Sequence, residues 1–215
     1  AALRSAGAVV HAVDLVMNQE FQAVFCAVRP PGHHAERNRA MGFCFFNNVA
    51  VGAAHALAEH GLERVAIVDF DVHHGNGTEH IFETEPRVLF CSSFQHPFYP
   101  FTGHETDTPH IVNITLPAGS DGARFREEVE RHWLHRLNEF EPQLVLISAG
   151  FDAHAEDDMS HVRLREPDYI WITRELKRVA DQHANGRIVS TLEGGYNLSA
   201  LGRSAVAHVD ALLGH

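Results

Sequence analysis

The sequence has few cysteines and no long apolar run. Its 215 residues include only three cysteines, Cys26, Cys44 and Cys91, which lie far apart and form no Cys-x-x-Cys pair. This spacing argues against a disulfide framework and against a thiolate metal site, so we expect free thiols in a reducing compartment. No apolar run reaches the roughly 20 residues of a membrane span, and the first residues lack the pattern of a secretory leader. These absences predict a cytoplasmic protein without membrane contact.

Basic residues are scarce as well. Lys and Arg number 17 and Asp and Glu 28, so 17 − 28 gives a formal net charge of −11. An acidic chain without a basic block cannot neutralise many phosphates, so no direct nucleic-acid binding is expected. The acidic surface suits a basic peptide or a polyamine instead. The sequence leaves open whether the protein forms an oligomer.

Histidine, in contrast, is abundant, with 18 residues. This excess points to metal or proton-transfer chemistry, although composition does not say which residues matter. Most of these histidines, His60 and His208 among them, fall in predicted helices and are expected to have no special role. Those that follow predicted strands are the candidates for chemistry.

Short apolar, β-branched runs alternate with amphipathic helical stretches. The predicted strands cover Ala23–Val28, Val65–Asp69, Val88–Ser92, His110–Thr115, Leu144–Ser148 and Arg187–Thr191. The predicted helices cover Ala1–Met17, Asn47–His60, Gly77–Phe82, Arg124–Phe140, Pro167–Asn185 and Ser199–Leu213. This alternation predicts an α/β fold with a three-layer αβα architecture around a mostly parallel sheet, and the length fits a single domain over residues 1–215.

Polar, glycine-rich segments follow four of the predicted strands. They are Arg29–His34, Asp71–Gly77, Ala149–His154 and Glu193–Tyr196. Because the carboxyl ends of parallel strands meet at one edge of the sheet, and ligands bind beyond that edge, we expect these segments to converge on one site.

Two carboxylates and one imidazole in these segments have the pattern of a metal site. Asp71 and His73 are two residues apart, so their side chains point to the same side of an extended segment. Asp152 follows a different strand and supplies a third ligand. Three protein ligands leave a coordination position open, as in catalytic zinc sites, and this donor set also suits ferrous iron or manganese. By its spacing from Asp152, His154 could also be a ligand.

A histidine pair and a tyrosine are candidates for proton transfer. His33 and His34 follow a stiff Pro-Pro-Gly turn, and rigid placement suits acid/base catalysis. Asp69 and Asn76 could bind the second ring nitrogens of this pair and orient the rings. Tyr196 follows two glycines, so its phenol could approach a ligand and donate to a developing oxyanion.

Five segments, taken together, identify a family. They read RPPGHHA at 29–35, GFCFFNN at 42–48, VDFDVHHGNG at 68–77, SAGFDAH at 148–154 and EGGYN at 193–197. In order and spacing they resemble the zinc-dependent histone deacetylases. The resemblance is closest to the class II branch and to its bacterial deacetylase-like and acetylpolyamine amidohydrolase relatives, and it covers essentially the whole chain.

The resemblance implies an arginase-like α/β fold and a role for each candidate residue. The implied zinc ligands are Asp71, His73 and Asp152, whereas His154 is implied to lie behind these ligands or at the surface. His34 is implied to act as general base and acid with His33 as its electrostatic partner, while Tyr196 polarises the acetyl carbonyl. Asp69 would pair with His33 and Asn76 with His34; because a carboxylate favours an imidazolium and an amide does not, His33 is expected to be charged and His34 neutral.

The resemblance also implies a substrate channel and a second cation. The implied channel residues are Gly42, Phe43, Tyr99 and Gly195. The implied structural potassium ion would bind to main-chain carbonyls and to serines, namely those of Asp69, Asp71, His73, Ser92 and Ser93. It further implies that a family region upstream of Ala1, with the first strand and a substrate-binding rim loop, is missing from this chain.

The implied reaction is hydrolysis of an acetylated lysine side chain in a protein, with release of acetate. Small acetylated amines such as acetylpolyamines are alternative substrates on the same site. An arginase-like ureohydrolase with two manganese ions would need more bridging carboxylates than the sequence offers. A non-catalytic acyl-lysine binder is the alternative of another class, and the complete set of ligands, histidine pair and tyrosine argues against it.

Overall fold

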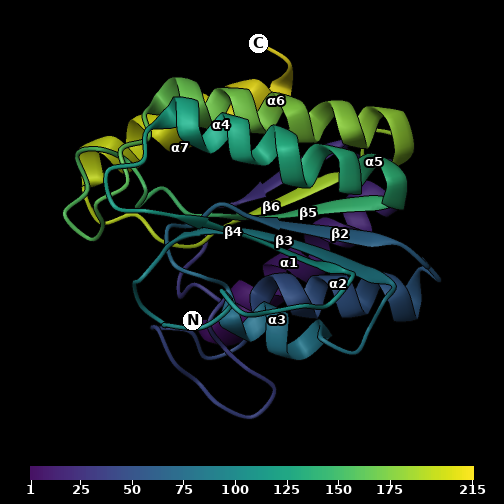
Figure 1. Ribbon diagram of the computed structural model, residues 1–215. Coiled ribbons are helices and arrows are strands. Elements are labelled where there is room, and N and C mark those ends of the chain that lie inside the picture. Colours follow the sequence, from purple (N-terminus) through teal and green to yellow (C-terminus); the bar gives the residue numbers. More distant parts are fainter.

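A computed structural model describes all residues, Ala1–His215, as a six-stranded sheet between two layers of helices (Figure 1). The strands are β1 Ala23–Cys26, β2 Val65–Asp69, β3 Val88–Gln95, β4 Ile111–Leu116, β5 Leu144–Ala149 and β6 Ile188–Leu192. Their order in the sheet is β1-β6-β5-β2-β3-β4, and every neighbouring pair is parallel. The predicted sheet is therefore confirmed, and it is wholly rather than mostly parallel.

Helices cover both faces of the sheet, which confirms the three-layer prediction (Figure 1). One face carries α1 Ala2–Met17, α2 Asn48–Glu59 and α3 Asn76–Phe82. The other face carries α4 Gly122–Val129, α5 His135–Phe140, α6 Glu166–His183 and α7 Leu198–Leu213. None of the helices combines the length and the apolarity required to cross a membrane; the cytoplasmic location stays a prediction.

The core lies on both faces of the sheet. One buried apolar cluster holds 27 residues and includes Phe70, Trp133 and Tyr169. The other holds 19 residues and joins the sheet to α1 and α2. All residues of β2, β3 and β5 are buried, because helices cover both faces of these strands. This double burial explains why the strands read as continuous apolar runs in the sequence.

The two largest differences from the sequence prediction concern β3 and the helix predicted at 124–140, whereas the other bounds agree within two residues. β3 continues to Gln95 rather than ending at Ser92, because its last residues pair with β4 in register up to Leu116. The predicted helix 124–140 contains a π-helical turn, η1 Glu130–Leu134, between α4 and α5. This turn carries the fully buried Trp133, whose Nε1 donates a hydrogen bond to the main chain of β4.

The sheet order fixes where a site can form. From β2 the chain proceeds outward to β3 and β4 on one side, and it returns to place β5 and β6 on the other side. β2 and β5 are neighbours, with Asp69 opposite Ser148 at their carboxyl ends. This is the switch point of the sheet, and a crevice for ligands forms beyond the strand ends at such a point.

Candidate active site

Two carboxylates and an imidazole converge at this switch point. Asp71 and His73 follow β2, and Asp152 follows β5; all three are buried, with ligand atoms within 4.8 Å of one another. His73 Nδ1 lies 3.1 Å from Asp71 Oδ1 and 3.1 Å from Asp152 Oδ2. The structure thus brings together the three residues that the sequence nominated as metal ligands.

The main chain anchors the remaining carboxylate oxygens. Gly194 N donates to Asp71 Oδ2 at 2.8 Å, and Val72 N donates to Asp152 Oδ1 at 3.0 Å. A Cβ on Gly194 would lie 2.1 Å from Asp152 Oδ2, so only glycine permits this approach. Each carboxylate therefore keeps one oxygen directed toward His73.

The charges of this group fit a bound cation. Two buried carboxylates face a single imidazole, and buried charges need compensation. Burial opposes a charge on His73, but the hydrogen bonds to Asp152 and Asp71 outweigh it and raise the pKa of His73 to about 10. A divalent metal ion could supply the same positive charge, and one nitrogen with two carboxylate oxygens is a donor set that zinc accepts.

The two adjacent histidines have different partners. His33 Nδ1 lies 2.8 Å from Asp69 Oδ2 and its Nε2 lies 3.9 Å from Asp71 Oδ1. Burial opposes a charge on His33, but these carboxylates outweigh it and raise the pKa of His33 well above its ordinary value. His34 Nδ1 lies 2.8 Å from Asn76 Oδ1, and burial together with the neighbouring His33 lowers the pKa of His34.

The amide of Asn76 determines which nitrogen of His34 carries the proton. Asn76 Nδ2 donates to Glu36 Oε1 at 2.8 Å, so Oδ1 is the amide atom that faces His34. An amide oxygen only accepts, so Nδ1 of the neutral ring must be the protonated nitrogen. His34 Nε2 then retains a free lone pair and can act as a base.

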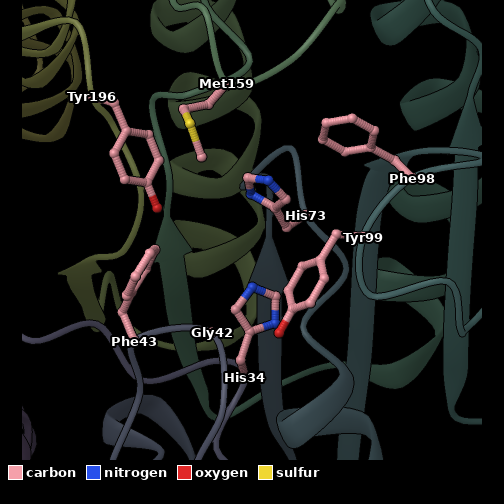
Figure 2. A pocket seen from close by; sticks show the side chains of 8 residues that line it. All are labelled: His34, Gly42, Phe43, His73, Phe98, Tyr99, Met159 and Tyr196. Carbon is pink, nitrogen blue, oxygen red and sulfur yellow. The ribbon is translucent and has the colours of Figure 1, made fainter.

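These groups border a cavity of about 430 Å³ (Figure 2). Its lining consists of His34, Gly42, Phe43, His73, Phe98, Tyr99, Met159 and Tyr196. The rings of Phe98 and His73 stack with centroids 5.5 Å apart, and the Tyr99 ring meets His34 edge-on at 5.2 Å. Figure 2 shows the two imidazoles among these aromatic rings. The cavity therefore combines an apolar wall with two nitrogen-bearing side chains.

Gly42 permits close packing against the base. Its φ is +55°, and a Cβ there would lie 2.2 Å from His34 Cδ2. Only glycine accepts both the left-handed conformation and the contact. The main chain next to Phe43 can thus lie directly against the His34 ring.

Tyr196 lies at the rim of the cavity, where the buried carboxylate of Asp157 binds the main chain. The N–H groups of Tyr196 and Asn197 donate to Asp157 Oδ2 at 2.7 and 2.9 Å, and Met159 N donates to Asp157 Oδ1 at 3.0 Å. The phenol hydroxyl of Tyr196 points into the cavity (Figure 2). Burial raises the pKa of Tyr196, so the phenol keeps its proton and can donate.

Comparison with known proteins gives this arrangement a family. The family model of the histone deacetylase domain matches residues 1–212. The chain belongs to the histone deacetylase family. It is 45% identical over 204 residues to an uncharacterized protein of Synechocystis sp., covering 94% of this chain and 65% of that relative. It is 39% identical over 224 residues to the polyamine deacetylase HDAC10 of Homo sapiens, covering 98% of this chain and 33% of that protein.

A solved structure agrees with the fold. The crystal structure of the HDA15 HD domain matches with a TM-score of 0.90 and 36% identity, over 98% of this chain and 61% of that chain. The chain thus has the arginase/deacetylase fold. It spans between about a third and two thirds of the length of these related chains.

One carboxylate of this deacetylase-family chain was not expected at the site. Glu193 is fully buried, and its Oε2 accepts from Gly32 N at 2.6 Å and from His33 N at 3.2 Å. Its Oε1 accepts from Ser148 Oγ at 3.0 Å. Burial raises the pKa of Glu193 to about 7. Its place in the EGGYN segment was a signal for it, but no motif indicated which groups it binds.

Some predicted placements need correction. Gly42, Phe43 and Tyr99 line the cavity as expected, but Gly195 does not, because its Cβ position faces Leu201. Phe98 and Met159 line it without having been predicted. Phe98 could have been found beside Tyr99 in the same aromatic segment, whereas nothing in the sequence singled out Met159.

His154 is not a metal ligand here. It lies fully buried with Nε2 3.4 Å from Glu166 Oε2, while its Nδ1 accepts from Glu156 N. It does not belong to the convergent group at the switch point. The spacing from Asp152 does not make it a ligand, because the chain turns after that residue and no longer alternates like a strand.

The serines of the predicted potassium site are buried near the three candidate metal ligands. Ser92 lies opposite Asp69 in the sheet, and its Oγ lies 3.1 Å from His74 Nδ1. Ser93 follows it on β3 and is also buried. The binding of potassium stays a prediction.

Two histidines that were expected to have no special role make hydrogen bonds with specific side chains. His208 is fully buried, with Nδ1 2.6 Å from Thr173 Oγ1 and Nε2 2.9 Å from Ser190 Oγ. His60 lies against Asp14. A helical pattern alone could not show this, because both sets of partners come from distant parts of the chain.

Proposed function

We propose that this chain is a zinc-dependent amidohydrolase domain, spanning residues 1–215, that removes the acetyl group from lysine side chains of proteins. The observation that carries the proposal is the free Nε2 of His34, which faces a cavity shared with a buried carboxylate–imidazole–carboxylate group. A positioned base beside a metal site is the arrangement that amide hydrolysis requires. Membership in the histone deacetylase family supports it.

Asp71, His73 and Asp152 would hold the metal ion. When bound, zinc would act as a Lewis acid toward the amide carbonyl and would make a water molecule more acidic. Ferrous iron would suit the same ligands. A potassium ion beside Ser92 and Ser93 would add a structural cation, in keeping with the buried charge of the site.

The side chains of the cavity account for the proton transfers. His34 accepts a proton from the attacking water at Nε2 and later donates it to the leaving amine, while the C–N bond breaks. His33, charged beside Asp69, stabilises the negative charge that develops during attack. Tyr196 donates its phenol proton as a hydrogen bond to the carbonyl oxygen as that atom becomes an oxyanion. The products are acetate and a free amine.

The shape of the cavity supports an acyl-lysine substrate. Phe43 and Tyr99 would flank the linear side chain, and their rings offer apolar surface to its methylene groups. A small acetylated amine presents the same linear chain. The relative named polyamine deacetylase HDAC10 makes acetylpolyamines the second candidate substrate class.

A comparison of turnover among three substrates tests the proposal. The zinc-loaded protein is given an acetyl-lysine peptide, acetylputrescine and acetylspermidine, and released acetate is measured. We expect turnover of the peptide to exceed that of both small amines. Strong preference for the small amines would replace the protein-lysine proposal with the polyamine one. Folded, zinc-loaded protein that binds the peptide without releasing acetate would establish a non-catalytic binder.

Asp152→Asn supplies the matched loss-of-function control. It keeps the side-chain volume but removes a charged ligand, so bound zinc and acetate release should fall together. His135→Gln, a change at a largely exposed histidine of α5, should leave both unchanged.

A further inference from the structure

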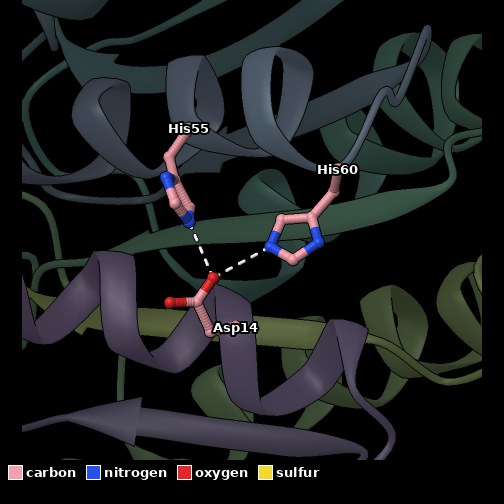
Figure 3. Close-up of side chains that lie close together, drawn as sticks. All are labelled: Asp14, His55 and His60. Carbon is pink, nitrogen blue, oxygen red and sulfur yellow. Dashed lines mark hydrogen bonds and ion pairs between the residues drawn. The ribbon is translucent and has the colours of Figure 1, made fainter.

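A second group of metal-ligating side chains lies in the helical layer, outside the active-site cavity. Asp14 is in the last turn of α1, His55 is in α2, and His60 immediately follows α2. Both imidazoles direct Nε2 at the same oxygen, Asp14 Oδ1, at 2.7 Å from His55 and 2.9 Å from His60 (Figure 3). The ligand atoms lie within 4.8 Å of one another.

This group holds a carboxylate where the local field disfavours one. The carboxyl end of a helix is the negative end of its dipole, and anions there are destabilised. Neither α1 nor α2 has a basic residue in its last turn. The only ion-pair partners of Asp14 are the two histidines. In a chain of formal charge −11, Asp14 thus has no lysine or arginine as an ion-pair partner; the nearby Arg187 contacts Met17 Sδ at the end of α1 instead.

The scaffold around the three donors is rigid and open to solvent. A Cβ on Gly52 of α2 would lie 2.6 Å from Val9 of α1, so the two helices approach closely one turn before His55. Donors carried on packed helices are held in place before a ligand arrives. The side chains remain partly accessible, at 39% for Asp14, 21% for His55 and 19% for His60. An ion can therefore reach them without unfolding.

We infer that Asp14, His55 and His60 form a second binding site for a divalent transition-metal ion such as zinc. Two neutral imidazoles and one carboxylate are ligands that zinc accepts, and the remaining coordination would come from water. The ion would replace the two hydrogen bonds at Asp14 Oδ1 and would balance the negative ends of both helices. It would join α1 to α2 and so stabilise the helical layer on this face of the sheet.

The experiment counts metal ions and measures their effect on stability. The purified protein is stripped, titrated with Zn²⁺ alone and assayed for bound zinc per chain and for its thermal unfolding midpoint. We expect two equivalents, with the second raising the midpoint. His55→Gln and Asp14→Asn should weaken the second equivalent by more than about tenfold, since loss of even an outer partner costs a metal site that much. They should retain the first equivalent and the hydrolysis of the acetyl-lysine peptide.

His11→Gln is the matched control, because His11 is an exposed histidine on the same helix but outside the group. It should bind two equivalents and show the same zinc-dependent shift as the parent. If the proposed catalytic site binds no zinc, the parent should bind one equivalent that His55→Gln loses, so the two proposals fail separately.

Three results would overturn the inference. The first is a parent protein that binds only the zinc that Asp152→Asn removes, so that this variant binds none. The second is a second equivalent that persists in both His55→Gln and Asp14→Asn. The third is a thermal midpoint that responds to pH but not to Zn²⁺, which would show that the group is only a histidine–carboxylate ion pair. The titration of the unmodified protein decides the matter even if one variant does not fold.

Discussion

Acidification should destabilise the fold through His208. This imidazole lies fully buried among α6, α7 and β6, and burial lowers its pKa to about 3, from an ordinary value of 6.5. The Thr173 hydroxyl donates to Tyr169 O, so it must accept from His208 Nδ1–H. The Ser190 hydroxyl then donates to Nε2. A second ring proton would therefore meet a donor, so the hydrogen bonds reinforce the neutral form.

The magnitude follows from the two pKa values. In the unfolded chain His208 binds a proton below pH 6.5, whereas in the fold it does so only near pH 3. The unfolded state thus binds more protons in this window, and the free energy of unfolding falls as the pH falls through it. From pH 7.5 to pH 5 the loss is about 2 kcal/mol, which is 1.36 kcal/mol for each of the roughly 1.5 pH units below 6.5.

A variant isolates this contribution from the many other titrating groups. His208→Gln cannot be protonated, so the parent should lose about 2 kcal/mol more than the variant between the two pH values. Urea unfolding followed by circular dichroism, with chelator present, gives both free energies. His135→Gln controls for the removal of a histidine from the surface. Parallel pH dependences of parent and His208→Gln would refute the reasoning.

Three further predictions concern the active site. Tyr196→Phe should lower kcat by roughly 10²–10³, as removal of an oxyanion donor does, with unchanged circular dichroism; near-normal turnover would remove Tyr196 from the catalytic set. Asn76→Asp places a carboxylate beside His34 and should raise its pKa, so the acid limb of the pH profile of kcat/KM should move to higher pH; coincident profiles would contradict the tuning. Asp157→Ala should lower kcat by freeing the loop of Tyr196 while zinc stoichiometry is retained, and a loss of zinc instead would point to wider disorder.

The position of the site could be predicted because it depends on topology. Parallel strands place their carboxyl ends at one edge, so Asp71 and Asp152 could be assigned to one site without knowledge of the sheet order. The pairing of His33 with Asp69 and of His34 with Asn76 also agrees with the expectation. These predictions succeeded because each needs only the order of short segments along the chain.

The features that were missed depend on contacts that no periodic pattern in the sequence encodes. Met159 reaches the cavity because Asp157 holds its main chain, and a rim loop of this kind has no periodic pattern. The extension of β3 includes Gln95, a polar residue that ends an apolar run in sequence but is paired within the sheet. His208 lies on the buried face of α7, but its neighbours there, Ala200 and Ser204, are small or polar and make no strong apolar stripe in sequence, so only the packing of α7 shows that it is buried.

Buried carboxylates explain how four loop segments are held together as one site. Glu193, after β6, accepts from the loop that follows β1. Asp71, after β2, accepts from the glycine pair that follows β6, and Asp152, after β5, accepts from the segment that follows β2. Each strand end is thereby tied to another by a charge-assisted bond to the main chain, which is stronger than a neutral one. The acidic residues of the site thus position the base as well as offering ligands, and this is why removing one of them should disturb His34 even where it touches no substrate.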